Sequence, residues 1–208
     1  MIDLPTYLTY TAVVLGLFLI PGPAVFLVLA RSVSGGRKVG MATRFGVALG
    51  DLIHTVMATL GLSAILMTSA LAFELVKYAG VAYLVYLGIR SILDKQGSLE
   101  LAKASKITAS QAFRQAIFAE ILNPKTALFF LAFLPQFISP SNGAVVPQFA
   151  ILGLTFVVMS MGYTSILAVA AGGVAGWINK HRQIGRWQGK VIGSIYLALG
   201  ARLALQHR

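Results

Sequence analysis

Long apolar runs separated by short polar connections dominate this 208-residue chain. Each run approaches the length of about 20 residues that a helix needs to cross the hydrocarbon core of a bilayer. The runs predict six membrane-spanning helices, at residues 6–30, 45–67, 75–93, 116–138, 149–171 and 191–205. The first run follows Asp3 with no basic residue before it, and no small-residue cleavage site comes after it. We therefore interpret it as a retained helix and not as a signal peptide.

The two halves of the chain resemble each other. Residues 21–23 (Pro-Gly-Pro) in the first predicted helix and 123–125 (Asn-Pro-Lys) in the fourth are each followed by an apolar run. The third and sixth predicted helices share an ordered series of Gly, Tyr, Leu, Gly and Arg. Because each half holds three spans, the halves would lie in opposite orientations. The sequence predicts an all-α integral membrane protein with six transmembrane helices in two inverted three-helix repeats. The single transport domain, 1–208, comprises repeat one (about 1–93), a cytoplasmic loop (about 94–113) and repeat two (about 114–208).

Composition and charge support this interpretation. Apolar residues make up 57% of the chain and charged residues 11%, against about 45–50% and about 25% in soluble domains. A soluble enzyme and a disordered chain are thereby excluded. The net charge is +11, and thirteen of the 17 Lys and Arg residues lie in the segments 31–44, 90–114 and 180–190. Bases in alternate connections predict cytoplasmic basic loops and termini outside, and they argue against nucleic-acid binding.

Two helix breaks are the first candidate site. Proline removes a backbone hydrogen bond from a helix and clashes with the preceding turn. Pro21, Gly22 and Pro23 interrupt the first predicted helix, and Asn123 and Pro124 interrupt the fourth. The breaks are either simple kinks or broken helices that line a binding site. Their matched positions, near the predicted midplane, favour the binding site.

Few ionisable residues lie within the predicted spans. Asp51 and His54 share one helix face, Lys125 comes from the other half at similar depth, and Glu120 lies nearer the cytoplasmic edge. A charge at mid-membrane costs about 3 kcal/mol without a partner or water. Lys125 is the expected counter-ion of Asp51, either as a structural ion pair or as part of a site for a zwitterion. His54 is either hydrogen-bonded packing or a carrier of the coupling proton.

Other features leave their roles open. Tyr163, Thr164 and Ser165 either line a pathway or bond to neighbouring helices. Small-residue pairs such as Gly46 with Gly50 predict close helix packing, within the chain or in a homodimer. Cysteine is absent and the three histidines are far apart, so the sequence predicts no metal site, no catalytic residue and no cofactor.

Several segments together resemble the LysE/RhtB family of bacterial amino-acid exporters. They are Pro21-Gly22-Pro23, Arg31-Ser32, Gly36-Arg37, Gly46 to Asp51, Ala82-Tyr83-Leu84, Tyr86-Leu87-Gly88, Asn123-Pro124-Lys125, Phe129-Phe130 and Pro135-Gln136-Phe137. The resemblance covers nearly the whole chain. It implies a plasma-membrane protein that moves amino acids or close derivatives outward, driven by an ion gradient. The family's usual Pro-Gly-Pro-Asn is Pro-Gly-Pro-Ala here, with Ala24 in the fourth place.

The resulting hypothesis is a secondary transporter and not an enzyme. It would export a small amino acid or derivative, such as leucine, threonine, homoserine or its lactone, across the bacterial inner membrane, with proton coupling and alternating access. The alternative is a membrane subunit or a membrane-embedded enzyme without transport activity. The expected partners are the amino-acid substrate and the lipid bilayer. The predicted substrate-binding or ion-coupling residues are Pro21, Gly22, Pro23, Ala24, Asp51, His54, Asn123, Pro124 and Lys125.

Overall fold

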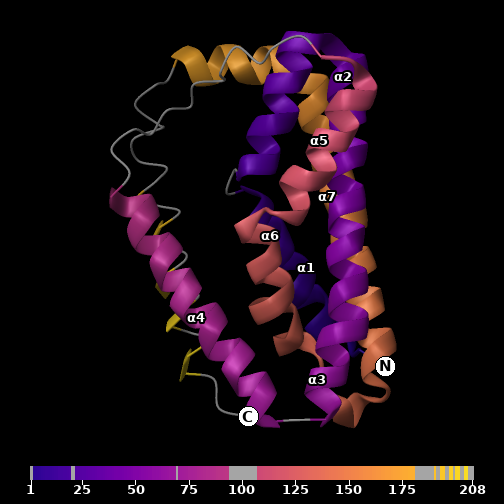
Figure 1. The fold of residues 1–208 in the computed structure, drawn as a ribbon, viewed down its shortest axis with the longest axis vertical. Helices are drawn as coiled ribbons and strands as arrows, with labels where there is room; N and C mark the ends of the chain where they lie inside the picture. Colours follow the sequence, from indigo (N-terminus) through magenta and orange to yellow (C-terminus); the bar gives the residue numbers. More distant parts are fainter. Residues whose placement is uncertain are drawn as a thin grey trace.

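The computed structural model describes residues 2–19, 22–68, 70–93 and 107–180, with positions 190, 193–194, 197–198, 200–201 and 204–205. Every element in these residues is helical, as the sequence predicts (Figure 1). The α-helices are α1 (Leu4–Leu19), α2 (Pro23–Met57), α3 (Ser63–Thr68), α4 (Ala70–Leu93), α5 (Ala109–Ile121), α6 (Pro124–Leu128) and α7 (Val145–Lys180). The π-helical turns η1 (Ala58–Leu62) and η2 (Phe129–Phe133) extend α2 and α6, and the short 3₁₀ turns are η3 (Leu134–Phe137) and η4 (Pro140–Asn142).

Helix α2 reverses direction at Gly36, which has a φ of 73°. That left-handed conformation is open to glycine and costly for other residues. Ser32 and Gly40 would lie about 12 Å apart in a straight helix, yet a Cβ atom on Gly40 would overlap the Ser32 side chain. The two parts of α2 therefore form a hairpin, which turns at the upper end of the molecule in Figure 1.

Two helices are long and apolar enough to cross a membrane in the described part of the chain, Pro23–Ile65 and Val145–Ala171. A bent pair, Ala109–Ile121 and Pro124–Phe137, would be a third span, with 43° between its parts. Leu4–Leu19 is apolar but shorter. The membrane-protein class is thus supported. Seven of the fifteen positions in the predicted sixth span, and the loop residues 94–106, lie outside the described residues.

Helix α5 begins within the segment that the sequence assigned to a loop, about 94–113, because its first residue is Ala109. The Thr108 hydroxyl accepts a hydrogen bond from the Gln111 N–H, and the Gln111 side chain accepts one from the Thr108 N–H. This reciprocal capping box satisfies two helix-end donors and starts the helix. The predicted fourth span breaks between α5 and α6, at the position of Asn123 and Pro124 where the sequence predicts an interruption.

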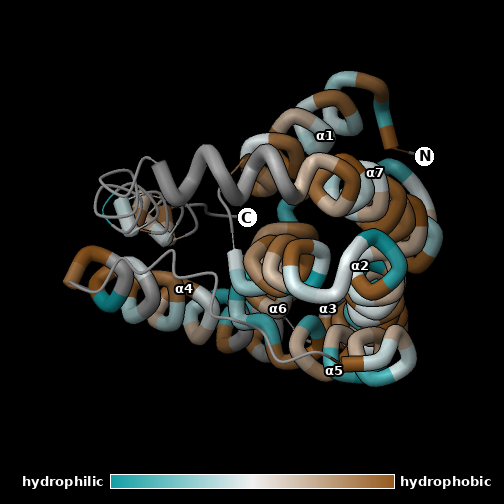
Figure 2. Tube along the Cα trace, turned by 90° about the horizontal axis from the view of Figure 1, so that it is seen from above, coloured by the Kyte–Doolittle hydropathy of each residue, from teal (hydrophilic) through white to brown (hydrophobic). Residues whose placement is uncertain are grey.

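Glycines let α5 approach α2 closely. A Cβ atom on Gly46 would lie 2.7 Å from Ala116 Cβ, and one on Gly50 would lie 2.5 Å from Glu120 Cβ. The later residue of α2 contacts the later residue of α5, so α5 runs parallel to the second part of α2. Figure 2 shows α5 and α7 on opposite sides of α2. The Gly46–Gly50 pair therefore serves packing within the chain.

Helix α7 runs antiparallel to the second part of α2. Ser160 of α7 contacts Asp51 of α2, and Gly153 lies against Thr55. The contact further along α2 thus involves the earlier residue of α7, which shows that the two helices run in opposite directions.

Glycines also bring Gly193, a described position of the last segment, close to α4. A Cβ atom on Gly193 would lie 2.5 Å from the Gly88 carbonyl oxygen.

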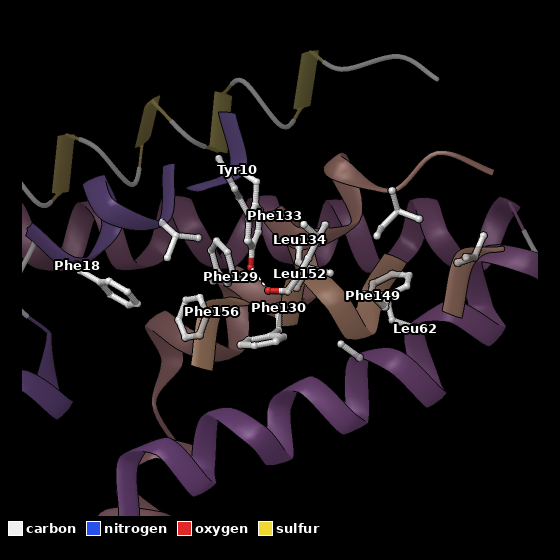
Figure 3. Packing of buried hydrophobic residues seen from close by; sticks show 14 residues of the cluster. Tyr10, Phe18, Leu62, Phe129, Phe130, Phe133, Leu134, Phe149, Leu152 and Phe156 are labelled. Carbon is white, nitrogen blue, oxygen red and sulfur yellow. Dashed lines mark hydrogen bonds between the residues drawn. The ribbon is translucent and has the colours of Figure 1, made fainter. Parts of the chain in front are cut away.

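An aromatic cluster fills the space between α1, α7 and the η2–η3 turns (Figure 3). Phe129 stacks on Phe156 with ring centroids 4.8 Å apart. The buried Tyr10 hydroxyl donates to the Leu152 carbonyl at 2.7 Å. This packing holds the η2–η3 segment against α7 and places the second break beside the first.

Candidate functional site

The first helix break lies between α1 and α2. Gly22 is the N-cap of α2 and Pro23 follows at the first helical position. Pro21 lies outside the described residues. In an unbroken helix, the Leu17 carbonyl would accept from the N–H of residue 21, and a proline has no N–H. The Lys125 ammonium group donates to that carbonyl instead, at 2.7 Å.

The second break lies between α5 and α6. Asn123 is the N-cap of α6, its side-chain oxygen accepts from the Lys125 N–H at 3.1 Å, and Pro124 occupies the first helical position. In an unbroken helix, the Glu120 carbonyl would accept from residue 124, which again has no N–H. His54 Nε2 lies 3.1 Å from this carbonyl oxygen. An oxygen of this kind only accepts, so Nε2 is the donor.

The two breaks are therefore linked crosswise. Lys125 of the second half binds the Leu17 carbonyl of the first half, and His54 of the first half binds the Glu120 carbonyl of the second. The Glu120 carbonyl also accepts from the Asn123 N–H at 3.0 Å, so His54 adds a second hydrogen bond to it. The bonds from Lys125 and His54 connect the two breaks.

A cavity of about 40 Å³ lies where the breaks meet. This volume is enough for a few water molecules. Its lining includes five of the predicted site residues: Gly22, Ala24, Asp51, Asn123 and Lys125. The lining also contains residues that the prediction left out or left open: Glu120, Thr126, Ser160, Tyr163 and Thr164.

Two buried carboxyl groups line the cavity. Asp51 and Glu120 are 1% and 2% exposed, and their carboxyl groups interact with each other. Ser160 donates to Asp51 at 2.6 Å. Glu120 accepts from the Asn123 amide at 3.1 Å and from the Thr126 hydroxyl at 2.5 Å. Hydroxyl and amide donors thus partly replace the water that these carboxyl groups lose on burial.

The Lys125 ammonium group interacts electrostatically with the Glu120 carboxyl. The side chain of Lys125 also crosses the first break, where a Cβ atom on Gly22 would lie 3.0 Å from Lys125 Cδ. The carboxyl of Asp51, the counter-ion that the sequence suggested, accepts from Ser160 and interacts with Glu120.

The remaining predicted residues lie around the cavity. His54 is buried and its ring stacks on Phe130 with centroids 5.6 Å apart. Pro23 and Pro124 begin the helices that follow the two breaks. Of the polar residues left open on α7, Tyr163 and Thr164 line the cavity, and Ser165 accepts a hydrogen bond from Arg44.

Glu120 is the main residue that the sequence reasoning missed. It was placed nearer the cytoplasmic edge because it precedes the break, yet the bend brings its carboxyl to Asp51. A signal was present, since Glu120, Asn123 and Thr126 recur at a spacing of three residues and so share a helix face. No group of three His, Cys, Asp or Glu side chains that could hold a metal occurs in the part of the chain that the structure describes.

Apolar helices interrupted at prolines around a buried site of mixed charge are the architecture of membrane transport proteins. The chain belongs to the LysE type translocator family, whose profile matches residues 15–207.

Several curated proteins are similar over nearly their whole length. A homoserine/homoserine lactone efflux protein of Salmonella typhimurium is 34% identical over 189 residues, covering 90% of each chain. A leucine efflux protein of Klebsiella pneumoniae is 30% identical over 201 residues, covering 95% of this chain and 94% of the relative. An uncharacterised membrane protein of Pseudomonas aeruginosa is also 30% identical over 201 residues, covering 94% and 93%. No solved structure matches the chain.

Proposed function

We propose that the protein exports a small amino acid or amino-acid derivative across the bacterial inner membrane. The names of the relatives support leucine, homoserine and homoserine lactone as the first substrates to test. The cavity supports a zwitterion, because it places a lysine and two carboxyl groups within one small volume.

The proposed architecture is six transmembrane helices in two inverted repeats, with both termini outside. The crosswise hydrogen bonds between the two proline breaks support this arrangement. So do the directions of α2, α5 and α7, which fit consecutive crossings of a membrane. The basic segments 31–44, 90–114 and 180–190 would then lie in the cytoplasm.

The carboxylate of the substrate would bind at the first break. Gly22 gives α2 no side-chain cap, and Pro23 has no N–H. The next N–H groups, of Ala24 and Val25, begin the helix beside the cavity. Uncapped N–H groups at a helix N-terminus attract anions, through both hydrogen bonds and the helix dipole. Lys125 supplies the positive charge on the other side of the same break.

The ammonium group of the substrate would bind at Asp51 and Glu120. These two carboxyl groups repel each other when both are ionised, so the empty site is stabilised by one shared proton. A bound ammonium group supplies the same positive charge and can replace that proton. Release of the proton on one side and its return on the other would couple export to the proton gradient.

The observation that carries the proposal is the meeting of Lys125, Asp51 and the uncapped start of α2 in one cavity. The test is export from cells loaded with dipeptides of Leu, Thr, Lys and homoserine. Cells with the protein should release one free amino acid faster, and collapse of the proton gradient should remove the difference. Unchanged release of every amino acid would contradict the proposal and favour a subunit without transport of its own.

The variants Asp51→Asn and Lys125→Met should each abolish export while the protein remains in the membrane. Asp3→Asn and Lys38→Met are matched controls, because both side chains are exposed and lie away from the cavity. Full export by Asp51→Asn or Lys125→Met would contradict the assigned binding roles.

A further inference from the structure

Arg44 is a buried cation outside the cavity. It is 9% exposed and lies seven residues before Asp51 on α2, which corresponds to two helical turns or about 10 Å. Val47, one turn beyond Arg44 on the same face, lines the cavity. Arg44 is therefore placed between the hairpin at Gly36 and the site.

The guanidinium group of Arg44 has neutral partners. It donates to the Ser165 hydroxyl and lies over the Phe45 ring, 4.0 Å from the centroid. Its Nε is buried and has no hydrogen-bond partner. Among the described residues, no Asp or Glu forms an ion pair with it.

This arrangement leaves a buried charge incompletely compensated. Arginine remains protonated in proteins, so the charge persists, and a buried charge without a counter-ion is destabilising. The planar guanidinium carries parallel N–H donors that match a carboxylate. A carboxylate group is thus the ligand that would satisfy both the charge and the free donor.

Ser165 connects this group to the cavity. It follows Thr164, whose side chain lines the cavity on α7. Its own hydroxyl donates to the Met161 carbonyl, so it can accept from Arg44 without leaving α7. Arg31, on the first part of α2, donates to the Gln115 side chain of α5.

We infer that Arg44, oriented by Ser165, is a second carboxylate-binding site, which receives the substrate between the cytoplasmic surface and the cavity. The inference rests on the proposed export function and adds a separate step to it. A substrate carboxylate would bind Arg44 first and then move to Lys125 and the start of α2.

The test compares a substrate with its amide. Purified protein is reconstituted in liposomes, and transport of L-leucine from the cytoplasmic side is measured, with L-leucinamide as a competitor that lacks the carboxylate. Homoserine and its amide replace this pair if homoserine is exported faster. In Arg44→Gln, KM for the amino acid should rise about tenfold, as expected for one lost charge-assisted hydrogen bond. The inhibition constant of the amide should stay within twofold.

The controls separate binding from structure. Arg44→Lys keeps the positive charge but loses the parallel N–H donors of the guanidinium group, so it should raise KM less than Arg44→Gln does. It also provides a second variant if Arg44→Gln does not fold. Lys38→Gln changes an exposed base of the same hairpin and should behave as wild type. Equal weakening of amino acid and amide would overturn the inference and identify Arg44 as a structural tie between α2 and α7.

An unchanged KM for the amino acid in Arg44→Gln would also overturn the inference, and the export function would stand. Absence of transport by the wild-type protein for every amino acid of the panel would instead overturn the export function itself. The two failures are therefore distinguishable.

Discussion

The two helix breaks solve the same problem in different ways. Both begin a new helix with proline, but Asn123 caps the second helix with its side chain and Gly22 leaves the first one without such a cap. The N–H groups of the second break are thus partly satisfied by the protein itself. Those of the first break are available to a ligand. The difference supports the proposed binding of the substrate carboxylate at the first break.

The carbonyls before the two breaks are treated alike. Each accepts from a basic side chain of the other half, Lys125 at Leu17 and His54 at Glu120. These bonds must rearrange if the halves move relative to each other. The asymmetry between the breaks therefore lies in their helix starts and not in their carbonyls.

The largest effect should come from Lys125. Lys125→Met removes the donor to Leu17 and the cation beside Gly22, and should abolish measurable export, with kcat/KM lowered at least about 100-fold, or about 2–3 kcal/mol. Lys125→Arg keeps the charge and should retain part of the activity. Initial transport rates in proteoliposomes measure both. Equal loss in the two variants would show that the charge is not the important property.

A cap introduced at the first break should lower export by about tenfold. Gly22→Ser would supply a hydroxyl that accepts from the N–H groups of α2 and competes with the substrate carboxylate. Gly22→Ala is the matched control, because it adds the same Cβ atom beside Lys125 without a cap. Export rates compare the two variants. Identical rates would contradict an anion site at this helix start.

Removal of the cap at the second break should mainly affect stability. Asn123→Ala loses the bond to the Lys125 N–H and the bonds to Glu120, and should lower the free energy of unfolding by about 1–2 kcal/mol. Asn123→Ser retains a capping oxygen and should recover part of this loss. Thermal unfolding in detergent gives the comparison. Unchanged stability of Asn123→Ala would mean that the second break does not depend on its cap.

The smallest effect concerns His54. His54→Gln can still donate to the Glu120 carbonyl, whereas His54→Leu cannot, and the loss should be about 1 kcal/mol of stability. The dependence of export on the proton gradient should persist in His54→Gln. Loss of that dependence in both variants, with protein still in the membrane, would instead identify His54 as the carrier of the coupling proton.

The sequence predicted the helical class because apolar runs of this length favour helices in a membrane. It also located both breaks, since proline and glycine act on the backbone locally and need no tertiary partner. It did not predict the early start of α5, although Thr108 and Gln111 carry the capping pattern. The role of Glu120 was missed because its position depends on the bend that follows it.

The tertiary structure decided which charged groups meet. The positions of Lys125 and Asp51 along their helices suggested an ion pair between them. The packing of Gly50 against Glu120 places a second carboxyl beside Asp51, and this carboxyl interacts with Lys125. It also decided that Lys125 and His54 bind carbonyls of opposite halves. The depth of a residue in the membrane follows from its position along the helix. Which side chains face one another depends instead on how each helix is rotated and how closely the helices pack. The sequence therefore determined where the helices break, and only the packing of the helices determined which side chains bind the backbone at each break.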